Sequence, residues 1–219
     1  MERWRGALRE LDDQAADVGW RYGAFELDPT IPAEGVDAHA YLEARYDAAT
    51  VQSVYRRLAA VAAAEGLPLL DMAGLRVRPN TFAAHRLMTE ALAQGPGMQQ
   101  SMADALFAAY WAQGSDIGDH GVLVDVAAAS GLSAARAREV LAGDEHAAAV
   151  REEERQARQA GIRAVPTFVL DRRLAVSGAQ ASEALAGAVR QALAAEEEPP
   201  PRRSRRPSTR GAHLSAPSR

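Results

Sequence analysis

The stretch Gly161–Gln180, GIRAVPTFVLDRRLAVSGAQ, limits the possible folds more than any other part of the chain. Two short apolar runs, Thr167–Leu170 and Leu174–Ser177, flank a polar turn at 171–173, and this pattern predicts a β-hairpin. Pro166 stands directly before the first run. Because a proline cannot donate a hydrogen bond within a sheet, it is confined to the start of a strand or to an edge strand. The sequence therefore predicts a hairpin that a proline introduces.

Most of the remaining chain has a helical pattern. Apolar residues recur at helical spacing in a helix at 2–17 and in a final helix at 180–195. The alternating segment 20–27, WRYGAFEL, predicts one further strand, and the loop DPTIPAEGVD follows it. Between this loop and the hairpin we expect helices at 37–47, 50–65, 80–94, 99–113, 119–129, 133–142 and 144–160.

This order of elements divides the chain into an α/β domain and an insertion. Residues 1–36 and 161–195 are expected to form the α/β domain, and residues 37–160 an all-helical insertion domain. Residues 196–219 contain three consecutive prolines and too few apolar side chains to offset the entropy of ordering. We expect them to form a disordered tail, and we interpret its arginines as a solvated arm.

Local signals indicate several helix ends and faces. Asn80 is expected to cap the helix at 80–94, and Asp144 the helix at 144–160. Glu154 and Arg158 lie four residues apart in the second of these helices, a spacing typical of ion pairs on an exposed surface. We therefore predict that this face of the helix is solvated.

Composition excludes several functions. The net charge is −4, and the tail contributes six arginines against three glutamates, so residues 1–195 carry −7. An acidic body is a poor partner for nucleic acid. No run of about 18 apolar residues is present to span a membrane. The charged N-terminal stretch MERWRGALRELDDQ lacks the apolar centre of a secretion signal, so the cytoplasm is the expected location.

The 219 residues contain no cysteine. The chain therefore offers no disulfide, no thiolate nucleophile and no cysteine ligand for a metal. The string DIGDH at 116–120 brings together two aspartates and a histidine. We interpret these acids as helix caps, and we predict no metal site.

Three motifs resemble those of the DsbA-like thioredoxin-fold proteins, and most of all the FrnE-type branch. They are FEL with P..P.EGVD (25–37), NTF.AHRL (80–87) and G...VPTFVLDRR.AVSGAQ (161–180). They occur in the family's order, and the resemblance covers nearly everything before the tail. It implies an α/β, thioredoxin-like fold with a large helical insertion, and the activity of a thiol–disulfide oxidoreductase.

The resemblance also implies a binding site. In the family, the residue that matches Pro166 forms a cis peptide bond with its predecessor, here Val165, and the backbone there pairs with a bound thiol or peptide. Val165, Pro166 and Thr167 are therefore expected to bind substrate. The family's NTF.AHRL helix lines the facing side of the cleft, which makes Asn80 and His85 candidate contacts. The alternative for these two is a helix cap and a histidine at the boundary of the core.

The family's catalytic motif is the point at which this chain departs from the pattern. That motif is a Cys-x-x-Cys or Cys-x-x-Ser pair at the start of the helix after the first strand, where the helix N-terminus lowers the thiol pKa. Here the corresponding helix begins near Met1, so the central first strand and the motif are expected to be missing from the sequence. A start codon assigned too late is the preferred explanation, and a paralogue without catalysis is the alternative. Without that strand, either the strand at 20–27 pairs directly with the hairpin or two edges stay unpaired.

Three functions remain open. The first is a DsbA-like or FrnE-like thiol–disulfide oxidoreductase that is redox-inactive in these 219 residues and needs no cofactor. The second is an enzyme similar to the glutathione-dependent isomerases and kappa-class transferases, with glutathione as its cofactor. The third is a non-catalytic peptide-binding paralogue. The expected partner is a thiol or disulfide on a peptide or small molecule, with no nucleic acid and no membrane, and both monomer and homodimer remain open.

Overall fold

The computed structural model describes residues 2–13 and 18–197. In chain order, its elements are α1 (Glu2–Glu10), β1 (Val36–Asp37), α2 (Ala38–Glu43), α3 (Ala48–Ala64), the 3₁₀ turn η2 (Met72–Gly74), β2 (Val77–Arg78), α4 (Phe82–Ala93), α5 (Pro96–Phe107), the π-helical turn η3 (Ala108–Ala112), α6 (His120–Ser130), α7 (Ala134–Ala142), α8 (Ala147–Gln159), β3 (Thr167–Leu170), β4 (Leu174–Ser177) and α9 (Ser182–Glu197).

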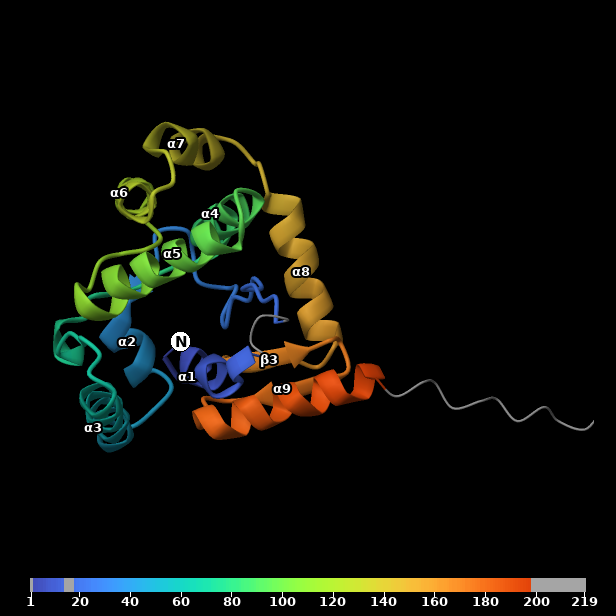
Figure 1. Cartoon of the computed structure of the whole chain (residues 1–219). Coiled ribbons are helices and arrows are strands. Elements are labelled where there is room, and N and C mark those ends of the chain that lie inside the picture. Colours follow the sequence, from blue (N-terminus) through green and yellow to red (C-terminus); the bar gives the residue numbers. More distant parts are fainter. Residues whose placement is uncertain (1, 14–17, 198–219) are drawn as a thin grey trace, which may run out of the picture.

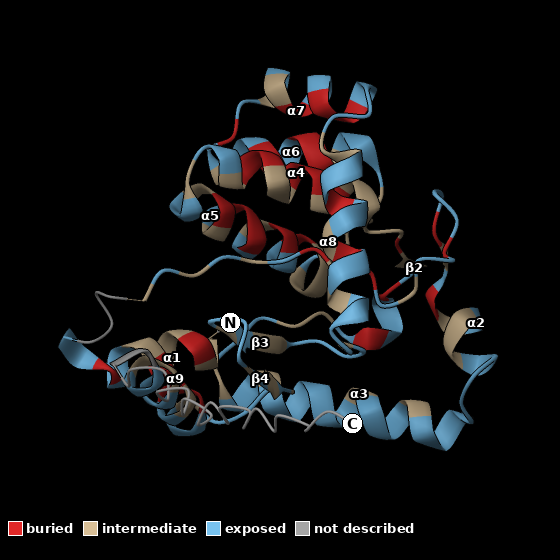
Figure 2. Ribbon diagram, turned by 90° about the vertical axis from the view of Figure 1, so that its right-hand side faces the viewer, coloured by how far each residue is buried: buried red, intermediate tan, exposed pale blue. Residues whose placement is uncertain are grey.

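The helices fall into two groups. Figure 1 shows α4, α5, α6 and α7 gathered above, while α1 and α9 lie side by side below, next to β3. The long helix α8 runs from the upper group to the lower one. In Figure 2 many of the buried residues lie in the upper group, whereas α3 contains none. This mixed arrangement agrees with a thioredoxin-like fold that carries a helical insertion. No helix in the described part of the chain is long and apolar enough to cross a membrane.

The hairpin has the predicted bounds. β3 and β4 pair antiparallel, from Thr167 opposite Ser177 to Leu170 opposite Leu174. In the turn, Asp171 and Arg172 take left-handed φ values of 49° and 57°. This local accuracy follows from the pattern of two apolar runs with a polar turn between them, which depends on no distant partner.

Aromatic side chains connect the hairpin to α1 and to the segment after it. Trp4 of α1 stacks on Phe168 of β3, with 5.3 Å between ring centroids. Trp20 meets Trp4 edge-on at 6.0 Å and Tyr22 edge-on at 5.3 Å. These four rings form a continuous aromatic row from β3 to Tyr22, and α9 closes the same core with Leu185.

The prediction of a β-strand at 20–27 is wrong. The segment pairs with no strand among the described residues, whose two sheets each contain only two strands. Alternate backbone amides of this segment instead donate to side chains of α5 and α8. The acceptors are Gln99 for Tyr22 (2.9 Å), Glu153 for Ala24 (2.9 Å) and Glu154 for Glu26 (2.8 Å). Of the two outcomes expected for a sheet without its central strand, direct pairing of this segment with the hairpin is wrong. The outer edge of β3 has no partner strand among the described residues, whereas side chains take the place of a ladder on one side of the segment.

The prediction that the face of α8 with Glu154 and Arg158 is solvated is also wrong. Glu154 is only 2% exposed. Its carboxylate accepts from the Glu26 amide and lies 3.0 Å from Arg151 and 3.8 Å from Arg158. An i,i+4 charge pair reveals spacing along a helix but not what covers that face. Here the extended segment covers it, and two arginines with one backbone amide compensate the buried charge.

Several helix ends differ from the predictions. The first helix ends at Glu10, and part of the range predicted for it, residues 14–17, lies outside the described residues. The cap of α8 is His146 rather than Asp144. Asp119 caps α6 by accepting from the Val122 amide, as predicted. The predicted tail at 196–219 lies outside the described residues except for its first two, which continue α9.

Candidate functional site

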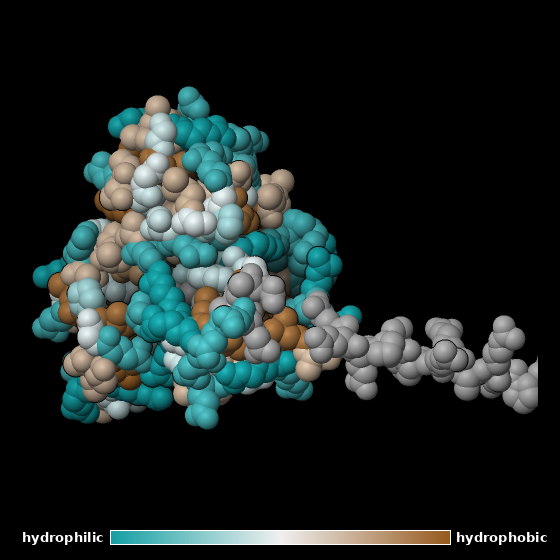
Figure 3. All heavy atoms as spheres, viewed as in Figure 1, coloured by the Kyte–Doolittle hydropathy of each residue, from teal (hydrophilic) through white to brown (hydrophobic). Residues whose placement is uncertain are grey.

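A cavity of about 750 Å³ lies between the two groups of helices. Its walls come from the extended segment 21–28, from α4, α5 and η3, from one side of α8, and from Val165. Large apolar side chains dominate them: Phe25, Leu27, Met88, Leu106, Phe107 and Trp111. In Figure 3, apolar surface also appears on the lower half of the molecule among polar residues. The size and apolar lining suit a small organic molecule or a short stretch of peptide.

Val165 brings the start of the hairpin to this cavity. Val165 as a whole residue is 48% exposed, and its peptide bond to Pro166 is cis. The Pro166 carbonyl accepts from the Gly178 amide at 2.8 Å and so points toward β4. Successive residues of a strand direct their backbone groups to alternate sides, so those of Thr167, the first residue of β3, point away from β4. Within residues 2–13 and 18–197, neither backbone group of Val165 has a hydrogen-bond partner.

His85 lies on the same cavity. It extends from α4 and is half-buried, and burial lowers the pKa of its imidazole below the usual value of 6.5. The ring is therefore neutral at neutral pH and can both donate and accept one hydrogen bond. The structure thus brings His85 and Val165, two of the five predicted contacts, to one cavity.

Asn80 has a different position. Its side-chain amide donates to the Ile31 carbonyl at 2.7 Å, and its Oδ1 accepts from the Phe82 amide at 2.9 Å. These bonds hold the loop before β1 against the start of α4, so Asn80 supports the cavity wall from behind. Like Pro166 and Thr167, it is not among the residues that line the cavity.

The acidic groups that line the cavity are already neutralised by arginines. Glu153 lies 2.5 Å from Arg21, and Glu26 lies 2.5 Å from Arg151. Hydrogen bonds from Thr30 and Tyr41 lower the pKa of Asp28 to about 2. None of these acidic residues was among the contacts predicted from the sequence. The one sequence signal that could have indicated them is the FEL motif, because it contains Phe25 and Glu26, which both line the cavity.

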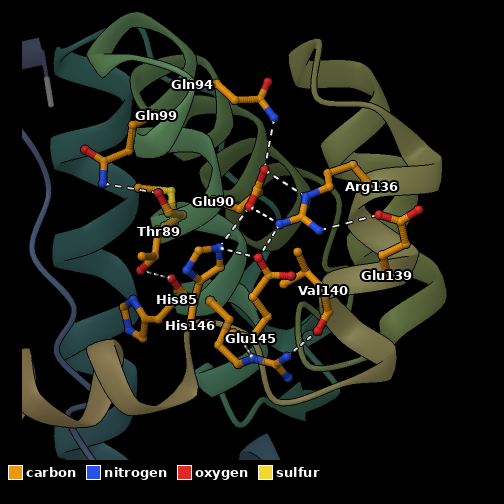
Figure 4. A network of polar contacts seen from close by, with 12 residues as sticks. His85, Thr89, Glu90, Gln94, Gln99, Arg136, Glu139, Val140, Glu145 and His146 are labelled. Atoms are coloured by element: carbon orange, nitrogen blue, oxygen red, sulfur yellow. Dashed lines mark hydrogen bonds and ion pairs between the residues drawn. The ribbon is translucent and has the colours of Figure 1, made fainter.

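A second polar cluster lies away from the cavity, between α4, α7 and the start of α8. Figure 4 shows Glu90, Glu145 and His146 close together, with single ligand atoms within 4.8 Å of one another. Arg136 lies among them, with its Nη2 atom 2.7 Å from Glu90 and 2.5 Å from Glu145. A guanidinium therefore already supplies the positive charge, and the cluster is an ion-pair network that fastens α7 and α8 to α4. Of the two DIGDH aspartates only Asp119 caps a helix, by accepting from the Val122 amide. Asp116 instead accepts from the Gly118 amide in the turn before α6, so the prediction of a helix cap is wrong for Asp116.

Comparison with known proteins places this geometry in a family. The family model of the DSBA-like thioredoxin domain matches residues 4–190, and the chain belongs to that family. A probable DsbA oxidoreductase from Streptomyces coelicolor is 31% identical, with 90% of this chain and 87% of that chain covered and a TM-score of 0.77. A 2-hydroxychromene-2-carboxylate isomerase shares the fold at 16% identity, with 90% and 91% covered and a TM-score of 0.58. No curated protein matched the sequence.

Proposed function

We propose that this chain is a thiol–disulfide oxidoreductase domain of the FrnE branch, whose described residues bind the thiol or disulfide substrate. Membership of the DSBA-like thioredoxin domain family supports the class of reaction. The observation that carries the binding role is that Val165, with both backbone groups unpaired among the described residues, forms part of the cavity wall. The cytoplasm is the proposed location.

The substrate is expected to pair with the hairpin edge through its main chain. An extended segment beside β3 can accept from the Val165 amide and donate to its carbonyl, as in β-strand addition. Its side chains would then enter the apolar cavity. Because the 219 residues contain no cysteine, they form no mixed disulfide themselves, and their contribution is to hold and orient the sulfur-bearing group.

A second candidate is a glutathione-dependent isomerase. The neutral imidazole of His85 favours it, because such a group in an apolar cavity can take a proton from a bound molecule and return it. This candidate requires glutathione as a cofactor, whereas the first requires none. A non-catalytic peptide-binding protein is the third possibility, and the same experiment separates all three.

Calorimetric titration of the purified chain tests these proposals. The probes are a short apolar peptide with one cysteine, as its symmetric disulfide, the same peptide with serine in place of cysteine, and reduced glutathione. The first proposal expects the disulfide to bind at least about 10-fold more tightly than the serine peptide. Equal binding of both peptides would indicate a non-catalytic peptide-binding protein, and binding of glutathione alone would support the isomerase.

A matched pair of variants locates the site. Val165→Arg places a bulky charge in the cavity wall and should abolish binding of the disulfide peptide. Val169→Arg makes the same change at a residue of β3 that is equally exposed (51%) but does not line the cavity, and it should leave binding unchanged. If both variants bind like the unmodified chain, Val165 is not part of the site and the proposal fails.

A further inference from the structure

We propose that α3 is the surface through which two copies of this chain associate, with Leu58 of each copy packed against Leu58 of the other. The contact would be made by Val51, Val54, Leu58 and Val61, which are called the α3 seam below. This inference goes beyond the proposed function, because α3 contributes no residue to the cavity wall.

Large apolar residues are exposed on two separate surfaces of the described chain. Leu27, Phe107 and Val165 line the cavity, and Val169 follows Val165 on β3. The five others lie in α3 or close to its ends: Tyr46, Val54, Leu58, Val61 and Leu67. The exposed fractions of the three within α3 are 49%, 37% and 41% in that order. Substrate binding at the cavity does not account for this second surface.

The helix α3 is held to the rest of the molecule at few points. It contains no buried residue, and it lies at the edge of the molecule in Figures 1 and 2. Of its side chains, only Tyr55 packs against a buried apolar cluster of the described residues. Just after α3, Glu65 lies 2.6 Å from Arg3 of α1. Because helices in proteins are stabilised mainly by packing of their apolar faces, this helix of 17 residues favours a further partner.

The spacing of the α3 seam suits a second copy of the same helix. Its residues recur at intervals of three and four, the repeat by which two helices pack along a common line. A helix turns about 100° per residue, so Arg56 lies on the opposite side and Arg57 at the border of the seam. The seam therefore carries no charge that would select an unlike partner.

An apolar, uncharged seam is complementary to itself, as an interface with two-fold symmetry requires. Leu58 is the middle one of the three exposed seam residues, between Val54 and Val61. It therefore meets its own copy whether the two helices run parallel or antiparallel. This property makes Leu58 the position at which a second copy can be distinguished from an unlike partner.

The size of the seam determines how strongly two copies can associate. The 17 residues of α3 span about 25 Å, and a pair of packed helices covers a strip about 10 Å wide. A standard protein interface buries about 800 Å² on each partner, which is more than this strip offers even when Tyr46 and Leu67 extend it. We therefore expect weak association, with a dissociation constant of about 10 to 100 µM.

Sedimentation velocity of the full chain tests the proposal at concentrations from about 5 to 500 µM, which bracket the expected dissociation constant. The weight-average sedimentation coefficient should rise from the value of a monomer toward that of a dimer. Leu58→Glu should weaken the association at least about 10-fold, because pairing would bury two unpaired carboxylates. The matched control is Ala60→Glu, which places the same charge at an exposed residue on another side of the helix and should leave the association unchanged.

A mixture of two variants shows whether the partner is a second copy. Leu58→Arg alone should be as monomeric as Leu58→Glu, whereas an equimolar mixture of the two should associate again, because opposite charges then meet at the centre of the seam. Circular dichroism should show that all variants are folded. The proposal is overturned if the unmodified chain stays monomeric over the whole range, or if Ala60→Glu weakens the association as much as Leu58→Glu. A mixture that stays monomeric would also overturn it, since Leu58 would then not face its copy.

Discussion

The helical block of α4–α7 and the layer formed by α1, α9 and the hairpin bury their side chains in different ways. In the block, helices surround a shared core that includes Leu87, Met102, Leu123 and Val140, all fully buried. In the layer, α1 and α9 cover only one face of the hairpin. On the opposite face Val169 and Ala175 are exposed.

This difference indicates which region of the molecule is stabilised mainly by polar contacts. The block is closed by apolar packing, and its ion pairs fasten helices that already have a core. The extended segment 20–27, which leads out of the layer, has its amides held by Gln99, Glu153 and Glu154 instead of by a neighbouring strand. We therefore expect truncation of apolar side chains to affect the block most, and changes of charge to affect the segment most.

The largest effect is expected from Leu123→Ala in the block. The residue is 0% exposed and surrounded by helices, so the vacated space cannot collapse, and we expect a loss of about 4 kcal/mol in the free energy of unfolding. Leu185→Ala in the layer makes the same change at a residue 1% exposed, but its thinner surroundings can relax, and the loss should be about 2 kcal/mol. Urea unfolding followed by far-UV circular dichroism measures both. Equal losses would show that the two cores are packed equally well.

The next effect concerns the buried carboxylate of α8. Glu154→Leu removes the acceptor of the Glu26 amide and leaves Arg151 with one carboxylate fewer, so we expect a loss of about 3 kcal/mol. Glu154→Gln retains an acceptor oxygen and should be less destabilising. Hydrogen exchange of the Glu26 amide provides a local measurement, and it should become faster in the leucine variant. An unchanged exchange rate would mean that this hydrogen bond does not hold the segment.

Acid should destabilise the block through Glu90. Hydrogen bonds from Arg136 lower the pKa of this carboxyl to about 2 from an ordinary value of 4.5. A lowered folded-state pKa gives stability that is present above 4.5 and is lost as the pH falls toward 2. We expect about 2 kcal/mol to be lost over that range. Glu90→Gln should flatten this part of the curve of unfolding free energy against pH, and a curve of unchanged slope would contradict the assignment.

The smallest expected effect has the opposite sign and lies in the segment. Burial is the main cause that raises the pKa of Glu26, and repulsion from Glu154 adds to it. A raised pKa in an acid means that the folded state binds the proton more tightly, so stability falls as the pH rises above 4.5 toward the folded-state value. In the Glu26→Gln variant, this decline of the unfolding free energy with rising pH should be absent. The measurement is the unfolding free energy of both proteins between pH 4 and 7, and parallel curves would refute the expectation.

Local patterns predicted the hairpin and the helical block well. The bounds of β3 and β4 match the prediction. A hairpin is predictable because its two strands and its turn are defined by residues that are neighbours in the sequence. The strand that the alternation at 20–27 predicted does not form. The alternation could not reveal that side chains of α5 and α8, about 75 to 130 residues further on, would take the place of a strand.

The candidate site was predicted in part. His85 and Val165 were found through motifs of a related family, and both lie on the cavity. The burial of Glu154 escaped prediction, because the segment that covers it is distant in the chain.

The row of aromatic rings from Phe168 through Trp4 and Trp20 to Tyr22 has an optical consequence. Trp4 and Trp20 are 6.0 Å apart and inclined at 75°, a distance and angle at which the transitions of two indoles couple strongly. The pair should therefore give a pronounced exciton signal in circular dichroism. Because Tyr22 at the end of the row also lines the cavity, a molecule that displaces the cavity wall should change this signal. The protein thus carries an intrinsic spectroscopic reporter of changes at this cavity.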